Sequence, residues 1–127
     1  MDINHIGIRT NNLERLKSFY VDYFAGKSSE KQEDPATLRE YYTISFGNGA
    51  SLELIYRKDI HRRIEGETLG LCHLSFTLDS EEQLNTLISQ LKKGGYVVSE
   101  PPVRTAAGKL QYVVYDPDSN KIRLEIC

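Results

Sequence analysis

The alternation of apolar and polar residues predicts a strand at the start of the chain and a helix directly after it. Within residues 3–9, Ile6 and Ile8 face one way, whereas His5, Gly7 and Arg9 face the other, polar side of the expected strand. Asn11 or Asn12 can cap the next segment, in which apolar residues recur at helical spacing until Gly26. We therefore expect a half-buried strand and an amphipathic helix that packs onto a sheet.

A hairpin is expected after this helix. Residues 40–46 and 50–56 are rich in residues that favour strands, and they flank a Gly-Asn-Gly turn. Apolar and polar side chains alternate along the second of these strands, and Glu53 lies on its more polar face.

The second half of the chain returns to the same order. His73 and Glu125 again lie on polar strand faces, whereas Cys72 lies on an apolar face and is interpreted as a core residue. The expected elements are a strand at 71–78, a helix that begins at Ser80 and ends at Gly94, a short strand at 96–98, and a hairpin of strands at 110–115 and 121–126.

A constant spacing between the two halves indicates an internal duplication. The offset is 68 residues from His5 to His73, from Leu16 to Leu84 and from Gly26 to Gly94. Glu125 follows Glu53 by 72 residues, so we expect four extra residues between the helix and the last strand of the second copy. The sequence thus predicts one domain, residues 1–127, made of two repeats at about 1–60 and 70–127.

Each repeat offers one histidine and one glutamate to a shared site. A single histidine or glutamate on a strand is more often a solvated or satisfied polar residue than a ligand. Four such residues at matching positions favour a metal site formed by His5, Glu53, His73 and Glu125. Two imidazoles and two carboxylates suit zinc, nickel, cobalt or iron, with room for two waters.

Composition and charge narrow the class of partner. The chain has 16 basic and 18 acidic residues without a Lys/Arg-rich run, which argues against a nucleic-acid or anionic-membrane partner. No apolar stretch approaches the roughly 20 residues of a membrane helix. Two cysteines are too few for a disulfide framework. We expect a soluble cytoplasmic protein with a small-molecule substrate.

Four motifs surround the candidate ligands. They are His5-Ile6-Gly7-Ile8-Arg9, Leu52-Glu53-Leu54, Cys72-His73-Leu74-Ser75-Phe76, and Asp116-Pro117-Asp118 before Leu124-Glu125-Ile126. These motifs resemble the vicinal oxygen chelate superfamily (glyoxalase, bleomycin resistance protein and dioxygenase), and within it bacterial glyoxalase I, or lactoylglutathione lyase. The resemblance implies an α+β fold of two paired βαβββ modules that form a cupped mixed sheet around a metal. It also implies a homodimer in which His5 and Glu53 of one chain face His73 and Glu125 of the other.

The resemblance further implies an activity in methylglyoxal detoxification. Such a lyase isomerises a thiol-methylglyoxal hemithioacetal to an S-2-hydroxyacyl thioester through an ene-diolate, with one divalent ion, most readily Zn, Ni or Co. By family likeness Glu125 is the base, Glu53 is a ligand or serves the opposite face, and Arg9 contacts a carboxylate of the thiol. Arg57 stands where the glutathione-dependent enzymes usually have Asn, so the thiol is glutathione or another small thiol.

Related classes remain open. Methylmalonyl-CoA epimerases resemble the chain around both histidines but usually carry Gln at the position of Glu53. By family likeness, extradiol dioxygenases have a two-His, one-Glu ligand set. Fosfomycin resistance proteins have a three-ligand metal site. Bleomycin-binding proteins typically lack the ligand set, which makes metal dependence the simplest discriminator between catalysis and drug binding.

Overall fold

The computed structural model describes residues 1–47, 49–63 and 65–126. The chain divides into two compact units, unit 1 (Met1–Arg63) and unit 2 (Ile64–Cys127). This division lies close to the expected repeat boundaries of about 1–60 and 70–127, and the union of the two repeats in one domain stays a prediction.

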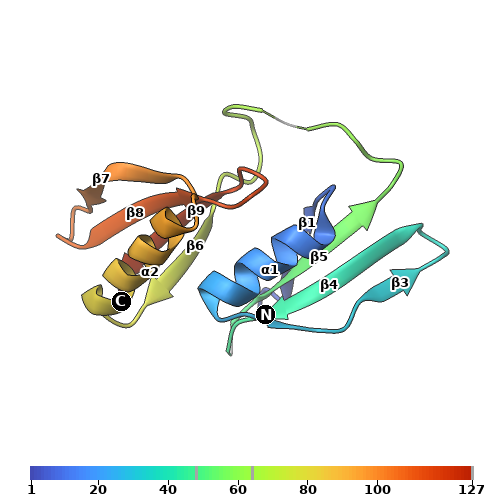
Figure 1. Ribbon diagram of the computed structural model, residues 1–127, viewed down its shortest axis with the longest axis horizontal. Coiled ribbons are helices and arrows are strands. Elements are labelled where there is room, and N and C mark those ends of the chain that lie inside the picture. The colour runs from blue at the N-terminus through green and yellow to red at the C-terminus, as the bar shows by residue number, and fades with distance from the viewer. Residues whose placement is uncertain (48, 64, 127) are drawn as a thin grey trace. The chain divides into compact units, whose positions relative to one another are not determined.

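Unit 1 is a helix on a mixed sheet. Its elements are β1 (His5–Arg9), α1 (Leu13–Phe24), β2 (Lys27–Ser28), β3 (Gln32–Asp34), β4 (Arg39–Ser45) and β5 (Ser51–Arg57). The strand order is β1-β5-β4-β2, and β3 pairs with β4. Strand β1 runs parallel to β5, whereas the other pairs are antiparallel. Helix α1 lies along one face of this sheet (Figure 1).

Unit 2 repeats this architecture. Its elements are β6 (Leu74–Leu78), α2 (Glu81–Lys93), β7 (Val98–Arg104), β8 (Leu110–Tyr115) and β9 (Lys121–Ile126). The order is β6-β9-β8-β7, again with one parallel pair, β6 with β9, followed by antiparallel pairs. The predicted α+β fold of two βαβββ modules is confirmed.

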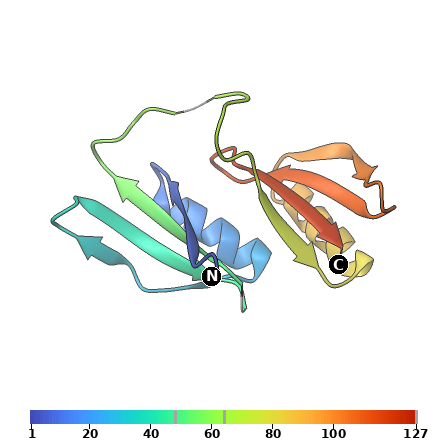
Figure 2. The same cartoon turned by 180° about the vertical axis from the view of Figure 1, so that it is seen from behind.

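The core of each unit lies between its helix and one face of its sheet. The residues that the sheets and helices bury most completely are Leu16, Phe19, Tyr20, Ile44 and Leu54 in unit 1, and Leu84, Leu91, Val114, Ile122 and Leu124 in unit 2. Because side chains alternate along a strand, the residues between these buried positions belong to the opposite face. Within each unit, the described residues place no helix on that face (Figure 2). It carries Glu53 in unit 1 and Glu125 in unit 2.

Both helices begin at side-chain caps. The Asn12 side chain accepts a hydrogen bond from the backbone N–H of Arg15, and the Ser80 side chain accepts one from Gln83. These contacts satisfy backbone donors that a helix start leaves unpaired. Among the described residues, no helix is both long enough and apolar enough to span a membrane.

Three local predictions differ from the structure. Strand β6 begins only at Leu74, so Cys72 precedes it and is exposed, and its assignment to the core is wrong. Strand β7 continues through Pro101 and Pro102, whereas the sequence predicted an end before them. An edge strand tolerates proline, because its outer side needs no backbone donor. The short strands β2 and β3 were not predicted.

Gly26 is required by packing at the end of α1. The left-handed residue of the helix cap is Ala25, with φ of 54°, and Gly26 follows it in a buried position. A Cβ atom at Gly26 would lie 2.5 Å from Ile44 Cγ2 and 3.1 Å from the carbonyl oxygen of Tyr20. The absence of a side chain therefore lets the chain pass directly over β4.

We expect Gly26→Ala to lower the free energy of unfolding by about 1–3 kcal/mol, the usual cost of overpacking a core. Urea unfolding measures this change. Gly49→Ala is the matched control, because a Cβ there meets only the carbonyl oxygen of Phe46 at 3.6 Å. Equal stabilities of the two variants would show that the core at Gly26 relaxes without cost.

Candidate metal centre

Unit 1 brings one expected histidine and one expected glutamate together. In the parallel pair β1 and β5, His5 lies opposite Ser51 and Gly7 lies opposite Glu53, so both candidate ligands share a sheet face. His5 Nε2 lies 3.4 Å from Glu53 Oε2. The side chain of Glu53 is only 15% exposed, against 47% for His5. The pair is thus open to solvent on the histidine side.

Neighbouring side chains orient this pair. Asn4 Oδ1 lies 2.8 Å from His5 Nδ1 and, as an amide oxygen, can accept a hydrogen bond from it, while Nε2 of the same ring faces Glu53. Arg39 Nη1 donates to Glu53 Oε1 at 3.2 Å, which leaves Oε2 for His5. Two electron-rich atoms at this separation call for a proton or a metal ion between them. Donors 3.4 Å apart can both reach an ion at the 2.0–2.2 Å typical of zinc.

Unit 2 places an arginine at the position that Glu53 occupies in unit 1. In the parallel pair β6 and β9, Ser75 lies opposite Arg123, and Thr77 lies opposite Glu125. Glu53 and Arg123 each pair with the residue two positions after the histidine of their unit. The expected equivalence of Glu53 and Glu125 is therefore wrong, because the strand registers of the two units are offset by 70 residues and not by 72.

The contacts of Arg123 change the chemistry of the second half. Its Nη1 lies 3.4 Å from His73 Nε2, and its Nη2 donates to Gln111 Oε1 at 2.6 Å. Since a guanidinium only donates, the lone pair of His73 Nε2 accepts this contact. Glu125 lies further along the strand, where its Oε1 accepts from Ser75 Oγ at 2.8 Å. Unit 2 thus presents a His–Arg pair with a carboxylate beside it.

The two halves differ in their fit to a divalent ion. The His5–Glu53 pair supplies an imidazole nitrogen and a carboxylate oxygen, which together suit zinc, nickel or cobalt. In the His73–Arg123 pair, the guanidinium of Arg123 faces the lone pair of His73 Nε2, which a metal ion would need for coordination. Within residues 1–47, 49–63 and 65–126, no three His, Cys, Asp or Glu side chains form a group able to hold an ion. The four-ligand site stays a prediction.

The remaining predicted residues lie nearby or at the surface. Arg9 ends β1 on the same face as His5 and is exposed, and its role toward a thiol stays a prediction. Arg57 forms an ion pair with Asp59, and hydrogen bonding to Arg57 is the main cause that lowers the pKa of the Asp59 carboxyl. His61 is exposed, as expected.

Sequence reasoning missed four residues that shape the two pairs: Asn4, Arg39, Gln111 and Arg123. Arg123 carried a signal, because it lies on the same strand face as Glu125, two residues earlier. Arg39 and Gln111 act through contacts with residues on neighbouring strands, and these contacts have no local signature in the sequence.

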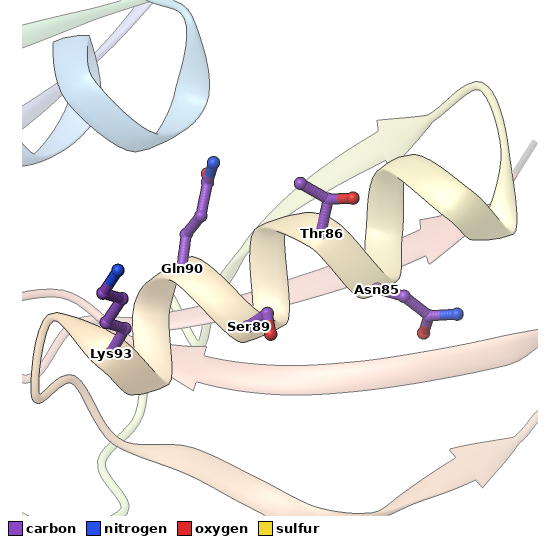
Figure 3. A pocket seen from close by; sticks show the side chains of 5 residues that line it. All are labelled: Asn85, Thr86, Ser89, Gln90 and Lys93. Atoms are coloured by element: carbon purple, nitrogen blue, oxygen red, sulfur yellow. The ribbon is translucent and has the colours of Figure 1, made fainter.

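A shallow surface hollow lies elsewhere, on the outer side of α2 (Figure 3). It is lined by Asn85, Thr86, Ser89, Gln90 and Lys93. None of these side chains is a preferred metal ligand, and the hollow lies on the helix, away from the sheet face that carries Arg123 and Glu125.

Comparison with models of protein families identifies the family of this chain. A family model described as Glyoxalase/Bleomycin resistance protein/Dioxygenase superfamily matches residues 2–124. The chain belongs to this superfamily. The resemblance seen in the sequence is thereby confirmed, and the His5–Glu53 pair lies within the matched part. A search of curated proteins returned no match.

Solved structures of this superfamily share the fold. The glyoxylase/bleomycin resistance protein/dioxygenase domain from Frankia sp. EAN1pec is 19% identical, with a TM-score of 0.85, and the match covers 99% of this chain and 97% of that one. A glyoxalase family protein from Enterococcus faecalis is 24% identical, with a TM-score of 0.79 and coverages of 98% and 96%. The trypanothione-dependent glyoxalase I from Leishmania major is 21% identical, with a TM-score of 0.79 and coverages of 99% and 86%. At these identities the likeness shows the fold alone.

Proposed function

We propose that the protein is a metal-dependent lyase of the glyoxalase I type. It would act on the hemithioacetal of methylglyoxal and a small thiol, and release an S-2-hydroxyacyl thioester. The observation that carries the proposal is the His5–Glu53 pair, with its two donor atoms 3.4 Å apart on adjacent parallel strands. Membership of the superfamily and the fold shared with a glyoxalase I support it.

In this proposal His5, Glu53 and His73 are the metal ligands, and Zn, Ni or Co is the ion. To bind the ion, His73 Nε2 would give up its contact with the guanidinium of Arg123. When bound, a divalent ion supplies a Lewis acid that stabilises negative charge on two adjacent substrate oxygens. Asn4 orients the ring of His5 through its contact with Nδ1, and Arg39 orients the carboxylate of Glu53. Such outer contacts typically change metal affinity by about 10–100-fold when removed.

Glu125 enters the proposal as the base and no longer as the symmetric counterpart of Glu53. Its Oε1 is anchored by Ser75 Oγ, while Oε2 accepts no hydrogen bond from the residues that the structure describes. A carboxylate with one oxygen held and one oxygen available can take a proton from one substrate carbon and return it to the next. Glu53 suits this task less well, because Arg39 and His5 engage both of its oxygens.

The proposal has three further parts. Arg9 would bind a carboxylate of the thiol, which is glutathione or another small thiol, because a guanidinium matches that group. The protein would work as a cytoplasmic homodimer with shared sites, in which His5 and Glu53 face His73 and Glu125 of the other chain. Sedimentation of the purified protein at the mass of a monomer would overturn the shared-site arrangement.

Metal content tests the proposed ligands. We expect about one divalent ion per chain in the reconstituted protein, and a nearly complete loss of that ion in His5→Ala, in Glu53→Gln and in His73→Ala, because each removes a direct ligand. Elemental analysis after desalting measures the ion. His61→Ala is the matched control, since His61 is exposed in the connecting segment. Metal content unchanged in the ligand variants would refute the proposed centre.

Arg123 favours a second candidate. With an arginine in the place of the fourth ligand, the remaining candidates form a two-His, one-carboxylate set, which is also typical of non-haem Fe(II) oxygenases. An extradiol dioxygenase of the same superfamily would consume oxygen in the presence of a catechol. Oxygen uptake by the Fe(II)-loaded protein, without turnover of any hemithioacetal, would replace the lyase by this alternative.

A further inference from the structure

Arg123 is a partly buried cation whose contacts are all with neutral groups. Its guanidinium reaches His73 Nε2 and Gln111 Oε1, and no carboxylate of the described residues forms an ion pair with it. Two other arginines have carboxylate partners: Arg39 pairs with Glu53, and Arg57 pairs with Asp59. A partly buried charge without a counter-ion is costly unless an anion completes its surroundings.

The guanidinium is also held in place with donors to spare. Gln111 is only 8% exposed and lies on β8, opposite Glu125. Its 2.6 Å hydrogen bond restricts Arg123 to one orientation. Arginine has five N–H donors, of which the contacts to Gln111 and His73 use two. Three N–H groups therefore remain for a ligand, enough for a two-point contact with a carboxylate.

Within unit 2, the position of Arg123 places this cation beside a proposed metal ligand, His73. It occupies in unit 2 the register position that Glu53, a proposed ligand, occupies in unit 1, and it touches His73, another proposed ligand. A substrate that contacts His73 would therefore also meet the guanidinium of Arg123.

We propose that Arg123 binds a carboxylate of the substrate, so that the site takes an anionic vicinal-oxygen compound in preference to a neutral one. This inference rests on the proposed function for the place of the substrate. The carboxylate can come from the thiol or, where a 2-oxo acid takes the place of methylglyoxal, from the carbonyl compound. Pyruvate represents the carbonyl compound and S-methylglutathione represents the thiol, while hydroxyacetone is a neutral compound of similar size to pyruvate.

The test uses the full chain after removal of metal by a chelator and desalting. Each probe is titrated while NMR follows the side-chain amide of Gln111 and the Nε–H of Arg123. We expect saturable binding of pyruvate or of S-methylglutathione, at least about tenfold weaker in Arg123→Gln, because a charge-assisted fork is lost. Arg123→Lys keeps the charge without the fork and is expected to bind with intermediate affinity. Arg104→Gln is the matched control, since Arg104 lies on β7 of the same unit and donates to the carbonyl oxygen of Gly108.

The result identifies the source of the carboxylate by which probe binds. The inference is overturned if neither anion saturates, if hydroxyacetone binds as tightly as the anions, or if a folded Arg123→Gln variant keeps the original affinity. Because the protein is free of metal in this experiment, its outcome does not depend on the ligand test of His5 and Glu53. A failure of the metal centre and a failure of the anion site are therefore distinguishable.

Discussion

Replacing Glu125 with glutamine is expected to lower the turnover of a hemithioacetal by about a hundredfold or more, and to leave the metal content unchanged. Positioned acid–base catalysis accounts for a rate factor of that order. Glutamine keeps the oxygen that accepts from Ser75 Oγ, so the side chain can stay in place while it loses the ability to take a proton. Turnover and elemental analysis on the same preparation measure both quantities.

The matched control for this substitution is Glu67→Gln, because Glu67 is exposed and lies outside every helix and strand. It should change neither rate nor metal content. Normal turnover by a metal-filled Glu125→Gln variant would exclude Glu125 as the base. A loss of metal together with activity would instead return Glu125 to the role of a ligand.

The fold was predictable because each element carries its own periodic signal. Alternation in β5 and helical spacing in α2 both follow from which side chains a sheet buries, and both were visible locally. The elements that escaped prediction lack such a signal. Strand β3 has three polar residues and is defined only by its pairing with β4. Strand β7 was cut short because its prolines argue against a central strand, whereas it lies at an edge.

The candidate site was half predictable for a related reason. The prediction that His5 and Glu53 lie on polar strand faces needed only the period of two, and the structure brings them together. Whether Glu125 occupies the position that corresponds to Glu53 depends on the register between β6 and β9. The spacing of residues along the sequence does not reveal that register. A shift by two residues keeps every side chain on its face, so the hydrophobic pattern could not reveal the error.

Exchange of Arg123 for glutamate tests this difference between the two units most directly. The substitution would place a carboxylate opposite Ser75, in the same register relation to His73 that Glu53 has to His5. It would also release the lone pair of His73 Nε2 from the guanidinium. Unit 2 would then hold a His–Glu pair of the kind that unit 1 already has.

We expect Arg123→Glu to bind a divalent ion at least about tenfold more tightly than the original protein, because one change removes a repelling charge and adds a direct ligand. Even the loss of an outer contact changes metal affinity by about 10–100-fold. Competition with a chelator of known affinity measures the dissociation constant. Arg123→Gln is the control: it removes the charge without adding a ligand, so it should improve affinity less than Arg123→Glu does. If Arg123→Glu binds zinc no better than Arg123→Gln, the side chain at position 123 does not face the ion. The correspondence of position 123 with Glu53 in strand register would then not apply to metal binding.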